Sequence, residues 1–385
     1  MRPAPRVNVS RRTALKAGAG AALAAGGGGA LLLGDGIAAA DGGSSMRRTA
    51  DDPSYVIGTG DWGARPPARK VSVSRGTTTK IVVHHTAFSN TTDYSYEAAL
   101  FLARRIQNLH MDDNGWIDSG QHFTISRGGY VLEGRHRSVK ALSHGGFQVV
   151  SAHAVGENRR GIGIENDGHY VNDTPPAALL FSLQRLCVTI GTQYGFGADR
   201  IFGHWDFNDT QCPGALFYRE FPALRRQVAQ VLGQSPDEIP ERTWPDTYSS
   251  SKGGTVEMVQ RLLRAYGYEL AADGVYGPVT LEAVHTFQRT MGLPAADDGT
   301  LDAATWEALT VPVSTGHSGD AVLAVQQMLV RKLHLAQATG SYDAATTAAV
   351  AEMQELHGLQ ATGAMDVATW CATAGGIVRE EFTTV

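Results

Sequence analysis

The pattern of apolar and polar positions predicts short strands and amphipathic helices in the middle of the chain. Four runs rich in β-branched and aromatic residues predict strands: Lys80–Val83, His122–Ser126, Tyr130–Glu133 and Ile162–Glu165. Apolar residues at helical spacing predict three helices, at Tyr94–His110, Thr174–Tyr194 and Gly214–Val231. Thr174 is the expected N-cap of the second helix, with two prolines in its first turn. This order predicts an α/β domain over residues 56–232, with a mixed sheet and flanking helices.

A second region follows a break in these patterns. Residues 233–252 are rich in Pro, Ser, Asp and Glu and lack periodicity, which is typical of a linker. Beyond it the chain repeats itself at an offset of 66 residues, so that Val259-Gln260 returns as Val325-Gln326. Each copy contains three amphipathic stretches. We therefore expect two small three-helix domains, at 253–311 and 316–375.

Composition narrows the class of protein. The 385 residues are enough for two or three domains, and 43% hydrophobic residues can fill their cores. A net charge of -5 gives no reason to expect nucleic-acid binding. Three cysteines make no disulfide framework, and we expect Cys187 and Cys371 to be core residues.

The N-terminus has the features of an export signal. Ser10-Arg11-Arg12 begins a stretch that resembles the twin-arginine signal, and a glycine-diluted apolar run and Ala38-Ala39-Ala40 follow it. We expect a signal peptide at 1–40, a flexible leader at 41–55, and secretion to the cell wall by the twin-arginine route. An uncleaved anchor is the alternative, but the apolar run is shorter than the ~20 residues that span a bilayer. No stable membrane insertion is expected after cleavage.

The residues with the clearest chemistry are two histidines and a cysteine. His204 and Cys212 stand eight residues apart, and His84 follows a predicted buried strand that would hold it rigidly. Each signal is weak by itself. Together they match the three protein ligands of a catalytic zinc, which keeps its fourth position for water.

Four motifs give the central region a resemblance to a known family. IVVHHTA at 81–87, GWIDSGQHFTISRGG at 115–129, GIGIENDG at 161–168 and GHWDFNDTQCPG at 203–214 occur in the order and spacing of that family. Residues 56–232 resemble the zinc amidases shared by phage T7-type lysozymes, bacterial N-acetylmuramoyl-L-alanine amidases and animal peptidoglycan recognition proteins. The resemblance implies His84, His204 and Cys212 as zinc ligands. His85 matches a variable neighbour and is left out of the metal shell.

The resemblance also implies a reaction and a substrate. The bond would be the amide between N-acetylmuramic acid and the first L-alanine of the peptidoglycan stem peptide. Glu165 matches the glutamate that serves as general base in one bacterial branch. Thr210 or Gln121 would stabilise the oxyanion. Many members carry tyrosine at the position of Gln121 and some carry lysine at that of Thr210, and neither replacement here can act as an acid.

The cleft and the repeats complete the prediction. His153 and Asn158 match cleft positions of the family and are expected to contact substrate. The repeats are similar to peptidoglycan-binding domain 1: DGVYGPVTLEAVHTFQ at 273–288 is close to its motif, whereas GSYDAATTAAVAEMQ in the second copy is degenerate. They would anchor a monomeric enzyme to the wall with little effect on its chemistry.

Two alternatives stay open. One is a wall-recognition protein without catalysis, against which the intact Cys212 argues, since non-catalytic relatives commonly lose that ligand. The other is a zinc hydrolase for a different amide.

Overall fold

The computed structural model describes residues 53–76, 78–333 and 335–383. The predicted signal peptide and most of the predicted leader lie outside these residues. Within the described part of the chain, no helix has both the length and the apolar character needed to cross a bilayer.

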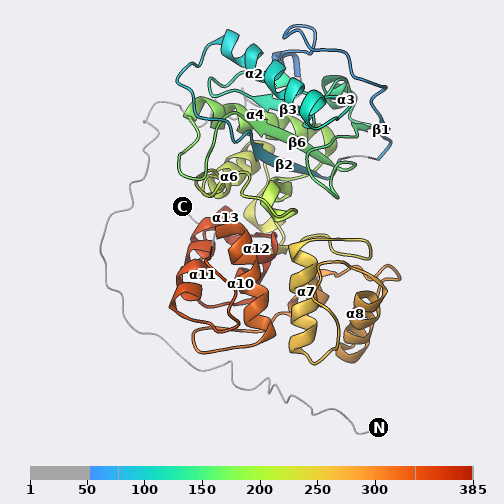
Figure 1. Cartoon of the computed structure of the whole chain (residues 1–385), viewed down its shortest axis with the longest axis vertical. Helices are drawn as coiled ribbons and strands as arrows, with labels where there is room; N and C mark the ends of the chain where they lie inside the picture. The colour runs from blue at the N-terminus through green and yellow to red at the C-terminus, as the bar shows by residue number, and fades with distance from the viewer. Residues whose placement is uncertain (1–52, 77, 334, 384–385) are drawn as a thin grey trace, which may run out of the picture. The chain divides into compact units, whose positions relative to one another are not determined.

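A five-stranded mixed sheet forms the centre of the first region (Figure 1), in the order β4-β3-β6-β2-β7. Its strands are β2 (Lys80–His85), β3 (Phe123–Ile125), β4 (Val131–Glu133), β6 (Gly161–Asn166) and β7 (Ile201–Gly203). Neighbouring strands run parallel except for β4, which pairs antiparallel with β3. The four strands predicted from the sequence are confirmed. The fifth, β7, was not predicted: it has only three residues and, unlike β3 and β4, it is not one of two apolar runs that flank a Gly-Gly turn signal.

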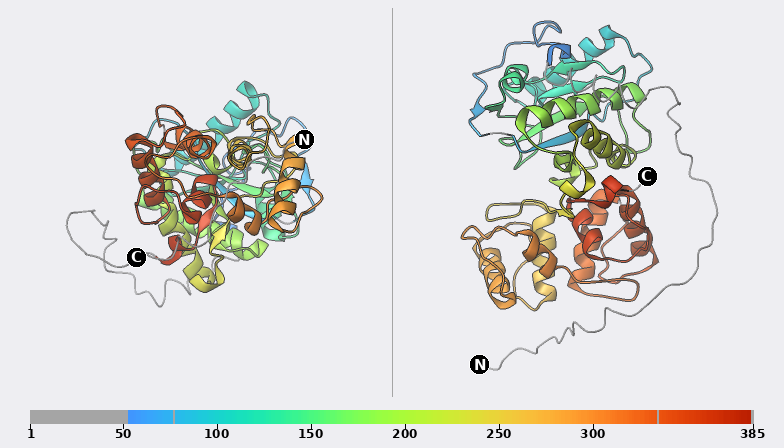
Figure 2. Two further views of the ribbon diagram at one scale, coloured as in Figure 1. Left: turned by 90° about the horizontal axis from the view of Figure 1, so that it is seen from below. Right: turned by 180° about the vertical axis from the view of Figure 1, so that it is seen from behind.

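Helices flank this sheet, as predicted. They are α2 (Tyr96–Asn108), α3 (Ser138–His144), α4 (Ala177–Tyr194), α5 (Ala215–Tyr218) and α6 (Phe221–Leu232). Alternate strand residues such as Ile81, Val83 and Ile164 share one buried cluster with apolar residues of α4 and α6. Helix α4, green in the right-hand view of Figure 2, lies across that face of the sheet. The other face of β2 and β6 is thereby left for polar side chains.

Two details of the predicted helices are wrong, and prolines explain both. Pro176, not Thr174, occupies the N-cap position of α4, and it makes no side-chain cap bond. A residue before proline is disfavoured in the helical region, so the pair Pro175-Pro176 delays the start of the helix. The helix predicted over Gly214–Val231 is divided into α5 and α6. Pro222 lacks the N–H that would continue α5 into α6.

Short elements connect these parts. One-turn helices are η1 (Pro53–Tyr55), η2 (Leu109–Asp113, a π turn), η3 (Ala198–Arg200), η4 (His204–Asp206) and η5 (Pro236–Glu238). Strands β1 (Val73–Ser74) and β5 (Gln148–Val149) pair antiparallel.

The repeats form two three-helix domains, as predicted. Repeat 1 contains α7 (Gly254–Ala265), α8 (Pro278–Met291) and α9 (Ala303–Leu309), and repeat 2 contains α10 (Asp320–Leu333), α11 (Ala344–Leu356) and α12 (Val367–Ala374). In repeat 1 the Gln260 side chain donates to Thr280 Oγ1 at 3.0 Å and accepts from the Gly274 N–H at 2.8 Å. Gln326 makes the equivalent bonds in repeat 2. The degenerate copy has therefore kept the internal framework.

Residues 233–252, predicted to be a linker, are held by contacts at several points. Strand β8 (Arg242–Thr243) pairs with β9 (Ile377–Val378), which lies between α12 and the short helix α13 (Glu380–Thr383). Ile239 is buried in the core of the first region. Trp244 stacks on Trp306 with ring centroids 5.1 Å apart. Ile239 and Trp244 are two apolar residues in an otherwise polar segment, and they pack it against the first region and against repeat 1.

Candidate metal centre

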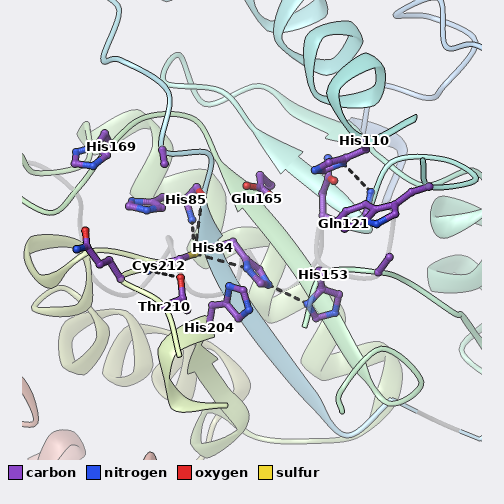
Figure 3. Close-up of a pocket in the computed structure, with 15 residues that line it drawn as sticks. His84, His85, His110, Gln121, His153, Glu165, His169, His204, Thr210 and Cys212 are labelled. Atoms are coloured by element: carbon purple, nitrogen blue, oxygen red, sulfur yellow. Dashed lines mark hydrogen bonds between the residues drawn. The ribbon is translucent and has the colours of Figure 1, made fainter. Parts of the chain in front are cut away.

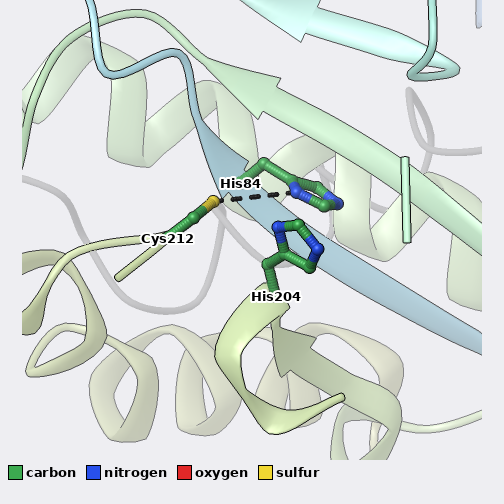
Figure 4. A group of neighbouring side chains, drawn as sticks. All are labelled: His84, His204 and Cys212. Atoms are coloured by element: carbon green, nitrogen blue, oxygen red, sulfur yellow. Dashed lines mark hydrogen bonds between the residues drawn. The ribbon is translucent and has the colours of Figure 1, made fainter. Parts of the chain in front are cut away.

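Three neighbouring segments bring the predicted ligands together. His84 lies near the end of β2, and β7, which pairs with β2, ends directly before His204. Cys212 follows on the loop after η4. The ligand atoms of the three residues all lie within 4.8 Å of one another (Figure 4). The sequence prediction of this triad is consistent with the geometry.

The hydrogen bonds of His84 determine which ring nitrogen is free. His153 Nε2 lies 3.1 Å from the Gly161 carbonyl, which can only accept, so His153 carries its proton on Nε2. His153 Nδ1, 2.9 Å from His84 Nε2, is then the acceptor, and His84 donates from Nε2. The free His84 Nδ1 faces Cys212 Sγ at 3.7 Å. This bonding leaves the lone pair of Nδ1 for a metal.

His204 shows the same arrangement. Its Nε2 lies 3.1 Å from Asn208 Oδ1. The Asn208 amide is oriented by Val155, whose N–H donates to Oδ1 at 3.1 Å and whose carbonyl accepts from Nδ2 at 3.2 Å. His204 therefore also donates from Nε2 and keeps Nδ1 free. Outer partners of this kind fix the ring orientation of metal-binding histidines.

Burial sets the protonation states of the three side chains. It lowers the pKa of His84 well below its usual value, with a further contribution from neighbouring histidines, and lowers that of His204 to about 4. Both rings are therefore neutral at pH 7, the form that binds metal. Burial raises the pKa of the Cys212 thiol, while the His85 N–H donates to its sulfur at 3.3 Å. Two neutral imidazoles and one sulfur form a donor set that fits zinc.

The triad opens into a pocket of about 400 Å³. Figure 3 shows its side chains converging from β2, β6 and the loops beside them. Glu165 on β6 is the register partner of His84 on β2, so both side chains project from the same face of the sheet. Ile162 and Ile164 point into the core instead. Burial raises the pKa of Glu165 to about 8, and a cation bound beside it would favour the carboxylate again.

The two predicted oxyanion donors, Thr210 and Gln121, both line the pocket but differ in whether they have a hydrogen free to donate. Thr210 Oγ1 accepts from the Cys212 N–H at 3.2 Å, which leaves the hydroxyl hydrogen free to donate. Gln121 donates its amide hydrogen to Thr124 Oγ1 at 2.8 Å, and its buried Oε1 has no partner. Thr210 is therefore the better placed donor of the two.

The two predicted substrate contacts also differ. His153 lines the pocket, but both of its ring nitrogens are hydrogen bonded, to His84 and to Gly161. Its ring lies against Gly163, where a Cβ atom would come within 2.4 Å of it. Asn158 does not line the pocket: its Oδ1 accepts from the His153 N–H at 2.7 Å and holds the loop. Substrate contact by Asn158 therefore stays a prediction, and the structure shows for it a contact within the loop.

Sequence reasoning missed several residues that line the pocket, namely His85, His110, Trp116 and His169. His110 lies on the π turn η2, accepts from the Gly120 N–H at 3.0 Å and packs on Trp116. Single-turn π segments occur often at functional sites. No sequence pattern marks such a turn, so His110 could be found only from the fold.

Family profiles match both regions of the chain. The family profile described as N-acetylmuramoyl-L-alanine amidase matches residues 74–215. The profile described as putative peptidoglycan binding domain matches residues 252–309 and 318–372. The range 318–372 is repeat 2, so the profile also matches the copy whose motif is degenerate.

Several curated proteins match the first region. Peptidoglycan-recognition protein SC2 of Drosophila melanogaster is 30% identical over 166 residues, which are 43% of this chain and 83% of that protein. Peptidoglycan-recognition protein LB of the same species is 29% identical, over 43% of this chain and 66% of that protein. The N-acetylmuramoyl-L-alanine amidase of Homo sapiens is 31% identical, over 48% of this chain and 32% of that protein. The match to each of the last two thus spans less than two thirds of the relative.

Solved structures match the same region. Wild-type Drosophila PGRP-LB aligns with a TM-score of 0.38 at 29% identity, over 43% of this chain and 91% of that chain. The profile matches and the SC2 relative show that the chain belongs to the N-acetylmuramoyl-L-alanine amidase family and carries two peptidoglycan-binding repeats after its amidase domain.

Proposed function

We propose that this protein is a secreted zinc amidase that cleaves the bond between N-acetylmuramic acid and L-alanine in peptidoglycan. The observation that carries the proposal is the convergence of His84, His204, Cys212 and Glu165 on one pocket. Family membership supports the substrate. Recognition of peptidoglycan alone would require neither a complete ligand triad nor a carboxylate beside it.

The side chains suit hydrolysis of an amide. A zinc ion held by the triad would acidify a water molecule and polarise the scissile carbonyl. Glu165 Oε accepts the proton of the attacking water and passes it to the leaving amine. The Thr210 hydroxyl donates to the oxygen on which negative charge develops. His153 and Asn208 hold the two histidine rings in the orientation that the site needs.

The repeats and the N-terminus complete the proposal. Repeat 1 exposes Val275 and Val279, with 44% and 65% of their surface accessible, where repeat 2 has Ser341 and Ala345. We infer that repeat 1 carries most of the affinity for the wall.

The protein would act as a monomer and leave the cell by the twin-arginine route. Replacing Arg11 and Arg12 with lysine should then leave precursor inside the cell, and unchanged secretion would exclude this route.

The decisive experiment is digestion of purified peptidoglycan followed by mass spectrometry of the products. Wild-type protein loaded with zinc should release free stem peptides that begin with L-alanine. Cys212→Ser should lose both the zinc and the products, because a hydroxyl is a far weaker ligand than a thiolate. Binding to the wall without released peptides would support the recognition protein, and cleavage at another amide would support a different hydrolase.

A further inference from the structure

Repeat 2 and the segment after it, which contains β9 and α13, are packed against the amidase domain, which a simple anchor would not require. Leu356 of α11, Ile377 of β9 and Phe382 of α13 belong to the same buried cluster as the core residues of α4 and α6. Arg225 of α6 forms a fully buried ion pair with Glu381 of α13. These contacts join residues more than 120 positions apart, and both apolar packing and buried charge hold them together.

One of these contacts reaches the metal centre. The Lys332 ammonium on α10 lies 3.0 Å from Asp206 Oδ1, and both side chains are almost completely buried, at 1% and 0% exposure. Asp206 stands two residues after the proposed ligand His204. A buried carboxylate without a cation is strongly unfavourable. Lys332 is thus the repeat 2 cation that compensates the charge of Asp206.

Asp206 in turn holds the turn that presents His204. Its Oδ2 accepts from the Gly203 N–H at 2.8 Å, which closes the 3-10 turn η4 onto the end of β7. The Tyr218 hydroxyl donates to the same carboxylate at 3.0 Å. His204 is the first residue of η4, so a displaced Asp206 carboxylate would change the direction of the imidazole.

A second, independent contact supports the same segment from the end of α12. Gly375 has φ +97°, and a Cβ atom there would lie 2.6 Å from the Asp206 carbonyl oxygen and 3.1 Å from its Cα. Only glycine allows so close an approach at a positive φ. Repeat 2 therefore touches Asp206 through a side-chain ion pair and through its backbone.

Repeat 1 has neither feature. At the offset of 66 residues Lys332 corresponds to Tyr266, and at the later offset of 64 residues Gly375 corresponds to Val311. The Tyr266 hydroxyl instead donates to Ala308 within its own repeat. The two copies share their internal framework but differ where repeat 2 contacts the metal-binding segment.

We propose that repeat 2 has become a positioning element of the metal centre, with Lys332 acting through Asp206 on the ligand His204. The proposal rests on the zinc site of the proposed function. Repeat 2 is then part of the enzyme's structure, and wall anchoring is left to repeat 1.

The test compares zinc affinity in full-length variants at a temperature at which all are folded. Lys332→Met keeps the length of the side chain but removes its charge. Its zinc Kd, from competition with a chelator, should rise about 10- to 100-fold, as is typical when an outer partner of a metal ligand is lost. The absorption bands of the cobalt-substituted protein should also shift, because they report ligand geometry. Lys332→Arg should largely restore both.

Glu381→Gln is the matched control. It removes a buried charge from the same interface, but Glu381 touches Arg225 and His357 rather than the η4 turn. It should lower the melting temperature and leave zinc Kd and the cobalt bands unchanged. If Lys332→Met behaves like this control, repeat 2 has a purely structural role and the proposal is wrong.

Two further results are informative. If Lys332→Met does not fold, Lys332→Gln also removes the cation that compensates Asp206 and is better tolerated beside a buried carboxylate. Its zinc Kd should rise as well, and wild-type zinc affinity in that variant would overturn the proposal. If the wild-type protein itself binds no zinc, the proposed function fails. That outcome is distinct from equal affinities in wild type and variant, which would refute only the role of Lys332.

Discussion

At the scale of single residues, the centre is built so that each histidine has one nitrogen committed and one free. His84 donates to His153 and His204 donates to Asn208, so both Nδ1 atoms remain available beside Cys212. Burial keeps both rings neutral. The same burial makes Glu165 sensitive to a neighbouring cation, since its pKa lies near 8 without one.

Glu165→Gln should keep fold and zinc but lower kcat by about 10² to 10⁴, the effect typical of losing a general base. The amide is nearly isosteric and cannot take a proton. Steady-state kinetics on a soluble muropeptide would measure the loss, and the acidic limb of kcat/KM should disappear. Asp167→Asn, a buried carboxylate in the same segment that does not line the pocket, is the control. Near-wild-type activity in Glu165→Gln would remove Glu165 from the mechanism.

His153→Leu distinguishes a positioning role from substrate contact. The His84 Nε2–H would lose its acceptor, so zinc Kd should rise about 10- to 100-fold. Chelator competition measures this directly. An unchanged zinc Kd combined with a raised KM would instead show that His153 binds substrate, as the sequence suggested.

At the scale of elements, Asp118 ties together segments around the edge of the amidase domain. Its carboxylate accepts from Gln107 of α2 at 3.0 Å and from the His136 backbone and ring at 2.8 and 2.9 Å. Burial by itself would raise the pKa of Asp118, but the bonds from His136 outweigh it and lower the pKa below 3.8. The bond to Asp118 raises the pKa of His136 above 6.5.

This pair predicts a pH window for stability. The contribution of Asp118 to the free energy of unfolding is complete above pH 3.8. It is lost as the pH falls through the lowered pKa of Asp118 in the folded protein. The His136 contribution is complete below pH 6.5 and is lost as pH rises through its raised folded pKa. Asp118→Asn should therefore lower the free energy of unfolding most between these two pH values, by about 1–3 kcal/mol. Denaturation of wild type and variant from pH 3 to 9 tests this, and a pH-independent difference would contradict it.

At the scale of the whole molecule, the question is whether the amidase domain can fold and work without the repeats. The modular pattern of the sequence suggested that a chain ending at Gln234 would keep its turnover. From the structure we expect the opposite, because such a chain would uncover apolar core residues and leave Asp206 and Arg225 buried without their partners. Loss of one partner of a buried ion pair alone costs about 3–5 kcal/mol.

The shortened chain should therefore aggregate or melt far below the full-length protein, and lose activity on soluble and wall-bound substrate alike. Thermal melting and assays on both substrates would measure this. A soluble shortened chain with full turnover on soluble muropeptide would show that repeat 2 is a separate module after all.

Local patterns along the chain are enough to predict several features of this protein. Alternation and helical spacing identified four of the five strands of the central sheet, the flanking helices and the two three-helix repeats. The motif around His204 and Cys212, combined with His84 after a strand, identified the ligand triad because strand ends and short loops fix residue positions locally. The resemblance to the amidase family pointed to Glu165, and strand alternation agrees with it because Ile162 and Ile164 face the core.

Features that join distant segments depend on packing in three dimensions and could not be predicted from local patterns. The tautomers of the two histidines depend on His153 and Asn208 meeting them in space. The hydrogen bond between Asn158 and the His153 N–H likewise depends on how the loop folds. The ion pair of Asp206 with Lys332 joins positions 126 apart, and no local periodicity records such a pairing. Which surfaces of amphipathic helices meet, and which buried charges compensate each other, is settled by packing in three dimensions.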